Sequence, residues 1–378
     1  MAGTEKIGIY IHIPFCARKC AYCDFYSAPY RADAAERYVG AVCHQLAGYE
    51  RRAADSVYFG GGTPSLLADG QTARLLDAVR GRMDVDGGAE ITLEANPATA
   101  SPEKLRALRA AGINRLSVGV QSTNDAALRA LGRLHTAKQA LQFLDDAAAA
   151  GFDNISADVM LAVPGDTEQT VLRSIRDLSA APVCHISAYL LKRMPGTPFY
   201  DAPPPGIPDD DAAAGLYELA CAALEERGFH QYEISNFAQP GRESRHNLKY
   251  WSCGDYLGLG PAASACVGRR RYSYRRDLAA YLRDFSAPPQ TMGNAQALAL
   301  LEDEGEVTQE DYIILRLRTA QGLDLKKLRS LYGYTFGTEK EAFLQRCARA
   351  GLLQRTGDTV ALTRRGFLVS NSILASLI

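Results

Sequence analysis

Three cysteines stand within eight positions near the start of the chain. Cys16, Cys20 and Cys23 have the spacing C-x3-C-x2-C. Three thiolates from one loop can bind three irons of a [4Fe–4S] cluster and leave the fourth iron open, whereas electron-transfer clusters normally take four cysteines. A zinc ion would need a fourth donor, and the nearest histidine is His12. Because unligated cysteines this close together invite oxidation, the spacing favours a cluster over zinc, and zinc over unligated thiols.

A glycine run and several polar residues follow the short apolar segments of the first half of the chain. The run is Gly60-Gly61-Gly62-Thr63, and the polar residues are Glu94, Gln121 and Asp158. Glycines let backbone groups come close to a ligand. If each apolar segment is a parallel strand, these groups gather at one rim, because ligands bind at the carboxyl ends of such strands. A ligand with an ammonium group, a carboxylate and ribose hydroxyls would use such a rim, and Arg133 could pair with its carboxylate.

Strand–helix alternation must position these groups. Helical patterns of period 3.6 separate six candidate strands, which span residues 7–13, 56–59, 90–95, 115–120, 154–160 and 185–190. Each helix returns the chain across the sheet, so the strands run parallel. Six units are fewer than the eight of a closed barrel. Periodicity leaves two α/β architectures open, an open doubly wound sheet and an incomplete barrel.

Local signals mark the ends of two of the helices. Ser101 and Pro102 read as an N-cap and first helical residue, with Gly112 as the stop. Asp166 and Gln169 resemble a capping box at the start of another helix.

The second half of the chain breaks this alternation. Prolines between 195 and 208 predict an irregular connection, followed by a helix over 209–227 and an extended segment over 231–237. A hairpin over 352–362, between helical segments, indicates a small winged-helix-like domain. Residues 291–378 hold eleven Lys and Arg against ten Asp and Glu, which gives no electrostatic footprint for DNA. We therefore expect three parts, namely 1–240 as the core, 241–290 as a connecting segment and 291–378 as the C-terminal domain.

Composition narrows the class of protein. The 378 residues are 47% hydrophobic and 22% charged, with a net charge of −1. This balance is typical of a folded chain and gives no global attraction to nucleic acid. No apolar run approaches the ~20 residues of a membrane span, and the first residues do not resemble a signal peptide. We expect a cytoplasmic protein without a nucleic-acid partner or a membrane span.

The cysteine triplet at the end of the first strand resembles that of the radical S-adenosylmethionine superfamily. There the cofactor's amine and carboxylate chelate the open iron, and reduction can yield a 5′-deoxyadenosyl radical. The whole chain resembles the oxygen-independent coproporphyrinogen III oxidase-like family, which implies an incomplete (β/α)6 TIM-like barrel with a helical C-terminal domain. The resemblance assigns the cluster to Cys16, Cys20 and Cys23. It assigns S-adenosylmethionine to Tyr10, Tyr22, Gly61, Gly62, Thr63, Glu94, Gln121, Arg133 and Asp158.

Two departures separate the chain from the oxidases, which carry a further cysteine two residues after the third and an N-terminal extension over the active site. Here Phe25 stands at that position, and only 15 residues precede Cys16. Instead, residues 246–251 read H-N-x-x-Y-W, which resembles the subgroup of haem chaperones known as HemW. The resemblance implies haem at His246, since histidine is an axial ligand of haem iron. Relatives often carry a second histidine where this chain has Ser264, which leaves the second axial ligand open.

Two functions of different classes follow from the resemblance. The first is a haem chaperone that binds haem and transfers it to an unidentified acceptor protein, with an electron donor serving the cluster. The second is a radical enzyme acting on a tetrapyrrole, either the oxidase itself or a haem-modifying enzyme. The missing cysteine and missing extension disfavour the oxidase, so we expect the chaperone.

Overall fold

The computed structural model describes residues 6–288 and 301–378, and one mixed sheet of twelve strands runs through most of it. Its strand order is β14-β13-β12-β11-β1-β4-β5-β6-β7-β8-β10-β9. The strands are β1 (Ile7–Ile13), β4 (Ala53–Gly61), β5 (Asp84–Ala95), β6 (Arg115–Gln121), β7 (Ile155–Leu161), β8 (His185–Leu190), β9 (His230–Gln231), β10 (Asn236–Ala238), β11 (Tyr256–Leu259), β12 (Ser264–Val267), β13 (Arg270–Tyr274) and β14 (Leu301–Glu306). The strands β1, β4, β5, β6, β7 and β8 are parallel neighbours, which confirms the six predicted strands.

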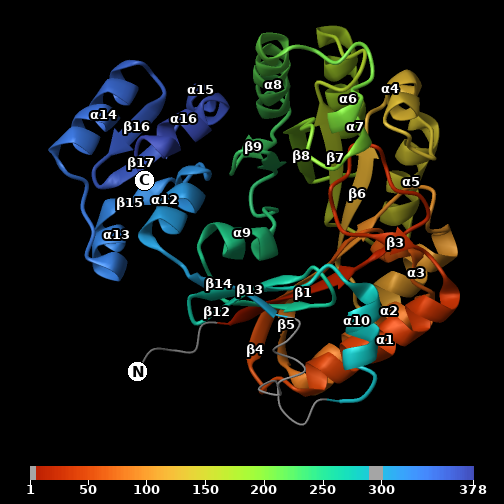
Figure 1. Cartoon of the computed structure of the whole chain (residues 1–378). Helices are drawn as coiled ribbons and strands as arrows, with labels where there is room; N and C mark the ends of the chain where they lie inside the picture. Colours follow the sequence, from red (N-terminus) through yellow and green to blue (C-terminus); the bar gives the residue numbers. More distant parts are fainter. Residues whose placement is uncertain (1–5, 289–300) are drawn as a thin grey trace.

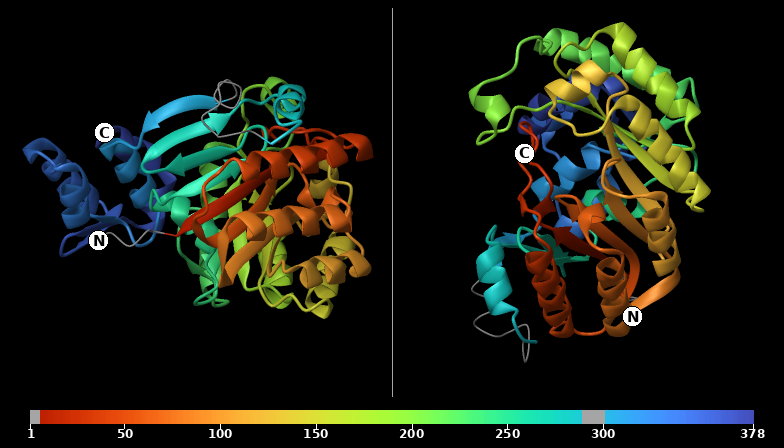
Figure 2. Two further views of the ribbon diagram at one scale, coloured as in Figure 1. Left: turned by 90° about the horizontal axis from the view of Figure 1, so that it is seen from below. Right: turned by 90° about the vertical axis from the view of Figure 1, so that its right-hand side faces the viewer.

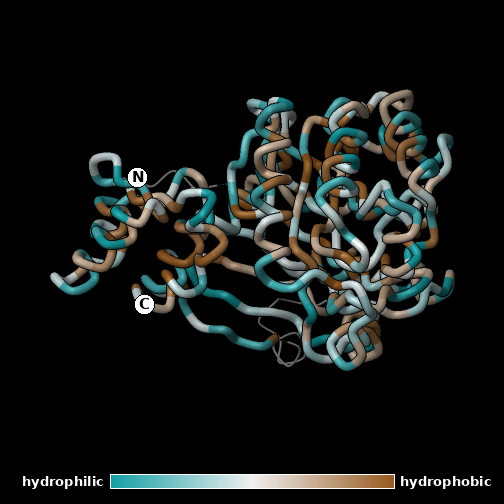
Figure 3. The backbone as a smooth tube through the Cα atoms, turned by 90° about the horizontal axis from the view of Figure 1, so that it is seen from above, coloured by the Kyte–Doolittle hydropathy of each residue, from teal (hydrophilic) through white to brown (hydrophobic). Residues whose placement is uncertain are grey.

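Helices cover the outer face of this parallel array (Figure 1). The helices of the core are α1 (Ala32–Ala47), the 3-10 turn η1 (Pro64–Leu66), α2 (Asp69–Arg82), α3 (Pro102–Ala111), α4 (Asp125–Ala130), α5 (Ala137–Ala149), α6 (Glu168–Ala180), α7 (Pro198–Asp201), α8 (Asp210–Glu225), α9 (Arg245–Trp251) and α10 (Leu278–Asp284). Of these, α9 does not lie on the outer face of the array. The strands are buried on both faces, as in other parallel sheets. Along β1 all residues except Tyr10 are buried, and the tube in Figure 3 is brown, hence apolar, along the inner strands.

The array stays open instead of closing into a barrel. β8 pairs with β10, which is antiparallel to it, and β1 pairs on its other side with β11. The predicted incomplete barrel is therefore correct, and the open doubly wound sheet is not, since the six parallel strands stand in chain order. Strands β11 to β14 extend the sheet beyond β1 (Figure 2). Residues 256–274 thus join the same sheet as the core, whereas the division into three parts stays a prediction.

Helix ends follow the predicted signals in one case and differ in the other. Ser101 Oγ accepts the N–H of Lys104 at the start of α3, and Gly112 ends that helix in the left-handed region. For α6, however, the predicted box of Asp166 and Gln169 is wrong by one residue. Thr167 is the N-cap and pairs with Thr170, while Asp166 accepts the Val163 N–H at 3.0 Å. A threonine hydroxyl next to the aspartate supplied the cap instead.

The C-terminal domain has the winged-helix-like order expected from the sequence. Its elements are α12 (Gln309–Leu317), β15 (Leu323–Asp324), α13 (Leu325–Tyr332), α14 (Thr338–Arg349), β16 (Leu353–Thr356), β17 (Thr359–Leu362), α15 (Arg364–Leu368) and α16 (Ser370–Ala375). β15, β17 and β16 form a small sheet, and the predicted hairpin is β16–β17. The domain lies beside the open side of the array, with α9 between them (Figure 1).

Backbone hydrogen bonds tie this domain to the core. The Ile234 N–H donates to the Arg318 carbonyl at 2.9 Å, and the Ala320 N–H donates to the Tyr232 carbonyl at 2.9 Å. Between them Glu233 and Thr319 form an isolated antiparallel bridge. Among the described residues, no helix combines the length and the apolar character needed to cross a bilayer.

Candidate functional site

A cavity of about 770 Å³, counting its open mouth, lies at the carboxyl ends of the parallel strands. All three cysteines of the triplet line it. So do eight of the nine residues assigned to S-adenosylmethionine by resemblance, namely Tyr22, Gly61, Gly62, Thr63, Glu94, Gln121, Arg133 and Asp158. The structure therefore brings the predicted cluster residues and eight of these nine residues to one place.

Backbone hydrogen bonds between two short strands hold the two ends of the cysteine loop together. β2 (Phe15–Cys16) pairs in parallel with β3 (Ala28–Pro29), so the loop leaves and returns at the same point. The loop is also joined to β1, since the Tyr26 carbonyl bonds with His12 Nε2 at 3.0 Å and His12 Nδ1 bonds with Tyr10 Oη at 3.0 Å. His12 is thus an anchor for the loop and does not line the cavity of the cysteines.

Two polar side chains donate to the sulfurs of the triplet. Thr63 Oγ1 donates to Cys16 Sγ at 3.6 Å, and Arg133 Nη1 donates to Cys20 Sγ at 3.8 Å. Within the described residues, no three His, Cys, Asp or Glu side chains are grouped as ligands of a metal ion. Support for a cluster therefore comes from the spacing, the shared cavity and these donors, which suit thiolate sulfurs.

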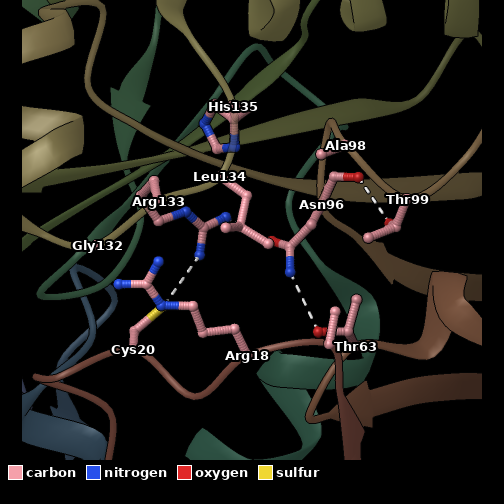
Figure 4. A pocket seen from close by; sticks show the side chains of 11 residues that line it. Arg18, Cys20, Thr63, Asn96, Ala98, Thr99, Gly132, Arg133, Leu134 and His135 are labelled. Carbon is pink, nitrogen blue, oxygen red and sulfur yellow. Dashed lines mark hydrogen bonds between the residues drawn. The ribbon is translucent and has the colours of Figure 1, made fainter.

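The second terminal nitrogen of Arg133, Nη2, also forms hydrogen bonds within the protein. Nη2 donates to Asn96 Oδ1 and, at 2.7 Å, to the Gly119 carbonyl. Figure 4 shows the guanidinium between Cys20 and Asn96, in a small cavity next to the first one. In this arrangement Arg133 connects the cysteine loop with Asn96 and with β6, and its role as a carboxylate partner stays a prediction.

The glycine run makes room for the cysteine loop. A Cβ on Gly62 would stand 2.6 Å from the Phe15 carbonyl oxygen, and one on Gly61 would stand 2.7 Å from the His12 ring. The Gly62 N–H donates to the Ile13 carbonyl at 2.8 Å, and the Thr63 N–H to the Phe15 carbonyl at 2.7 Å. Close approach of two backbones, which only glycine permits, thus fixes the loop on the end of β4.

Carboxyl and amide groups form the opposite side of the cavity. Glu94 accepts Tyr58 Oη at 2.9 Å and the Gly61 N–H at 3.1 Å. Burial raises the pKa of Glu94 to about 7, and burial also raises the pKa of Asp158. Gln121 has a φ of +71°, in the left-handed region, and its Oε1 accepts Tyr189 Oη at 2.9 Å. This unusual backbone conformation at the end of β6 directs the Gln121 side chain toward the cavity.

Two predicted residues do not line the cavity. Tyr10 packs beside Tyr58 within the barrel. The predicted haem ligand His246 is fully buried in α9, where Nδ1 bonds with Ser56 Oγ at 2.9 Å and Nε2 bonds with Tyr250 Oη at 2.8 Å. Burial lowers the pKa of His246 to about 3. To bind haem iron, the ring would have to give up one of these hydrogen bonds and become exposed.

Sequence reasoning missed some residues of the site. Tyr189 lies near the end of the sixth strand and lines the cavity, and Asn96, two residues after Glu94, connects Thr63 with Arg133. Tyr189 stands at the end of the sixth strand, where the rule that predicts polar groups at the carboxyl ends of strands also applies.

A second, larger cavity of about 1670 Å³, counting its open mouth, separates the array from the C-terminal domain. It shares Tyr22, Cys23, Phe25 and Tyr189 with the first cavity. Trp251, the last residue of the H-N-x-x-Y-W motif, also lines it. The cysteine loop thus stands between the two cavities.

Comparisons with known proteins agree with this architecture. The family model described as the Radical SAM superfamily matches residues 10–178, and the one described as the HemN C-terminal domain matches residues 306–369. The structure is similar to the coproporphyrinogen III oxidase HemN of Escherichia coli, with a TM-score of 0.82 at 21% identity, over 99% of this chain and 90% of that one. This likeness supports the fold.

Similarity to curated proteins extends along the whole chain. A protein of Bacillus subtilis called "Heme chaperone HemW" is 33% identical over 381 residues, which cover 98% of each chain. A protein of the same name from Mycobacterium tuberculosis is 33% identical over 384 residues, 99% of this chain and 95% of that one. The chain therefore belongs to the radical S-adenosylmethionine superfamily and, within it, to the HemW family.

Proposed function

We propose that this protein is a haem chaperone, which binds haem and passes it to an acceptor protein. The observation that carries the proposal is the similarity to two proteins named haem chaperones over 98% or more of the chain. Phe25 in place of the oxidases' further cysteine, and the H-N-x-x-Y-W motif, support the same function.

We propose Cys16, Cys20 and Cys23 as the ligands of a [4Fe–4S] cluster. The donor set fits, since three free, partly exposed cysteines face one cavity and receive hydrogen bonds from Thr63 and Arg133. Such a cluster supplies a reducible centre with one iron open to a further ligand.

The proposed place of S-adenosylmethionine is the same cavity. Glu94 would accept hydrogen bonds from its amino group, and Asp158 and Gln121 would accept from its hydroxyls or base. Tyr22 and the turn Gly61-Gly62-Thr63 would enclose it. Tyr10 would support the site indirectly, through its hydrogen bond with His12. The proposed partners are haem, an acceptor protein and an electron donor for the cluster, in a cytoplasmic setting.

Haem transfer tests the function directly. Anaerobically purified protein is loaded with one equivalent of ferric haem, freed of unbound haem, and mixed with apomyoglobin as a general acceptor. We expect the haem to bind in a defined ratio and then to move to the acceptor. A protein that does not bind haem, or that keeps its haem when the acceptor is added, would contradict the proposal.

The intact S-adenosylmethionine cavity supports a second candidate, a radical enzyme acting on a tetrapyrrole. Reduced protein is incubated anaerobically with S-adenosylmethionine and coproporphyrinogen III, and the products are separated by chromatography. We expect slow formation of 5′-deoxyadenosine without conversion of the porphyrinogen. Rapid formation of protoporphyrinogen would reject the chaperone.

A further inference from the structure

The small cavity drawn in Figure 4 reaches the cysteine loop from a face of its own. It measures about 380 Å³, counting its open mouth, and is lined by residues of the cysteine loop, of the stretch after β5 and of the turn between α4 and α5. Among the described residues, none lines both this cavity and the larger one next to the C-terminal domain. A partner on this face therefore leaves the larger cavity free.

The surface around this cavity is basic. Arg18 and Lys19 are exposed on the cysteine loop, and in the part of the chain that the structure describes neither forms an ion pair with an Asp or Glu. Residues 16–20, 96–99 and 129–135 contain no acidic residue. Positive charges that are not neutralised by neighbours attract an acidic partner and steer it to this face.

Leu134 gives this basic surface an apolar centre. Its side chain is 57% exposed, more than that of any other large apolar residue in the described chain except Phe25. Two further exposed residues, Ala17 and Ala98, line the cavity with it. An apolar centre with a charged rim is the usual composition of a protein–protein contact site. The arrangement therefore suits a protein surface better than a small ion.

A short connection leads from this surface to the cysteine triplet. Arg133, the neighbour of Leu134 in the chain, donates from Nη1 to Cys20 Sγ at 3.8 Å. Arg18 stands two residues before Cys20, and its Nη2 would lie 3.4 Å from a Cβ added to Gly132, so it packs against the turn that carries Leu134. Covalent bonds and one hydrogen bond thus join exposed Leu134 to a cysteine of the triplet. Electrons pass between two centres faster when the path between them is shorter.

We propose that the basic face formed by Arg18, Lys19, Arg133 and Leu134 is the docking site of an acidic electron-carrier protein. The inference rests on the proposed cluster and deepens it, since it names the place and the chemistry of electron entry. One electron passes from the reduced cofactor of the carrier to the oxidised [4Fe–4S] cluster, which becomes singly reduced, and no bond is formed or broken at the cluster. The chain has a net charge of only −1, so the attraction comes from this face and not from the overall charge. Redox encounters of this kind bury less than about 1,200 Å², and a single leucine with a charged rim is enough for them.

The test is a calorimetric titration of anaerobically reconstituted protein with an oxidised flavodoxin, which is an acidic flavoprotein. We expect the double charge reversal R18E/K19E to raise the Kd by about tenfold or more at low ionic strength. Raising the salt concentration from about 0.05 M to about 0.5 M should remove most of this difference, because salt screens exposed charges. L134A should raise the Kd by about fivefold at both salt concentrations, because an apolar contact is not screened.

Matched control variants lie on α13 of the C-terminal domain, on the opposite side of the molecule from α4 and α5 in Figure 1. K327E/R329E reverses two exposed charges and changes the net charge by the same amount as R18E/K19E. L331A truncates a leucine that is 42% exposed. Both controls should bind flavodoxin like wild type.

Rates of cluster reduction connect binding with electron transfer. Flavodoxin hydroquinone, mixed with the protein at concentrations below the Kd, should reduce R18E/K19E and L134A more slowly than wild type by the same factors as their Kd values rise. Dithionite, a small reductant that needs no docking site, should reduce all variants at similar rates. A redox titration should give one cluster potential for wild type and L134A, which separates docking from a change in the cluster itself.

The outcomes distinguish the inference from the proposed function. If dithionite reduces the cluster while flavodoxin does not bind, or binds wild type and both variants equally, the inference is overturned and the cluster and the chaperone function stand. If K327E/R329E weakens binding as much as R18E/K19E does, overall charge explains the effect and the inference fails. If wild type assembles no cluster, the proposed cluster fails together with the inference.

Discussion

The hydroxyl of Thr63 donates to the sulfur of Cys16 over 3.6 Å, and the same oxygen accepts the amide of Asn96 at 3.1 Å. A residue of the glycine turn is thereby coupled to the first cysteine of the triplet. Hydrogen bonds to cysteine sulfur stabilise the more negative, reduced state of an iron–sulfur cluster and so raise its reduction potential.

Removing this hydroxyl should make the cluster harder to reduce. We expect T63V to lower the reduction potential by tens of millivolts, roughly the effect of 1 kcal/mol or more on a one-electron couple. T63S keeps the hydroxyl and should retain the potential. The measurement is a redox titration followed by electron paramagnetic resonance, and an unchanged potential in T63V would show that this hydrogen bond does not act on the cluster.

Binding of S-adenosylmethionine should weaken as pH falls below neutral. Burial raises the pKa of Glu94 to about 7, and only the ionised carboxylate can accept the amino group of the ligand with both oxygens. Below that pKa the Kd should rise by up to about tenfold per pH unit. Calorimetric titrations between pH 6 and 8 measure it. E94Q should bind weakly at every pH and lose this component of the profile, so parallel profiles for wild type and E94Q would rule out Glu94.

Adding one methyl group at Gly62 should prevent cluster assembly. The Cβ of G62A would stand 2.6 Å from the Phe15 carbonyl oxygen and 2.9 Å from that of Ile13, both rigid backbone atoms. We expect little bound iron after reconstitution. Gly40, within α1, has no atom within 4 Å of its added Cβ, so G40A should keep the cluster and gain about 0.5–1 kcal/mol of stability. A full iron and sulfide content in G62A would mean that the loop can shift.

Replacing His246 should lower the free energy of unfolding. H246A removes a fully buried ring and leaves Ser56 and Tyr250 without partners, at a cost of about 3 kcal/mol in the free energy of unfolding. H230A, at an exposed histidine paired with Glu225, should cost less than about 0.5 kcal/mol. Urea unfolding at pH 7.5 measures both, and equal values would contradict the buried role.

The same histidine gives a pH dependence of known sign. Folding lowers its pKa from about 6.5 to about 3, so the unfolded chain takes up the proton first. Stability should therefore decrease as pH falls from about 6.5 toward 3. The slope should be shallower in H246A, and urea unfolding at pH 7.5, 6 and 5 compares the two. Identical slopes would mean that His246 is not buried as a neutral ring.

Local patterns predicted the fold better than the contacts between distant parts. The six parallel strands, the α3 caps and the β16–β17 hairpin follow from periodicity and turn residues, which are local properties. The rim residues Glu94, Gln121 and Asp158 were predicted because one rule, polar groups at the carboxyl ends of strands, applies to each of them separately. Strands β11 to β14 were not foreseen, since they join the sheet through the pairing of β11 with β1, a strand more than 200 residues away in the sequence.

Burial explains what the sequence could not reveal about ligands. From the sequence alone, His246 in its motif is expected to be an exposed ligand. The structure shows that Ser56, Tyr58 and Tyr250 surround it. Whether a buried polar group finds a hydrogen-bond partner depends on the whole fold.

Mössbauer spectroscopy of protein labelled with iron-57 tests the central claim, that three cysteines leave one iron of a cubane open. Anaerobically reconstituted protein should show a [4Fe–4S] cluster, and added S-adenosylmethionine should change the signal of one iron in four while the other three stay as they were. A spectrum without a cubane, or with four equivalent irons that ignore S-adenosylmethionine, would contradict the account.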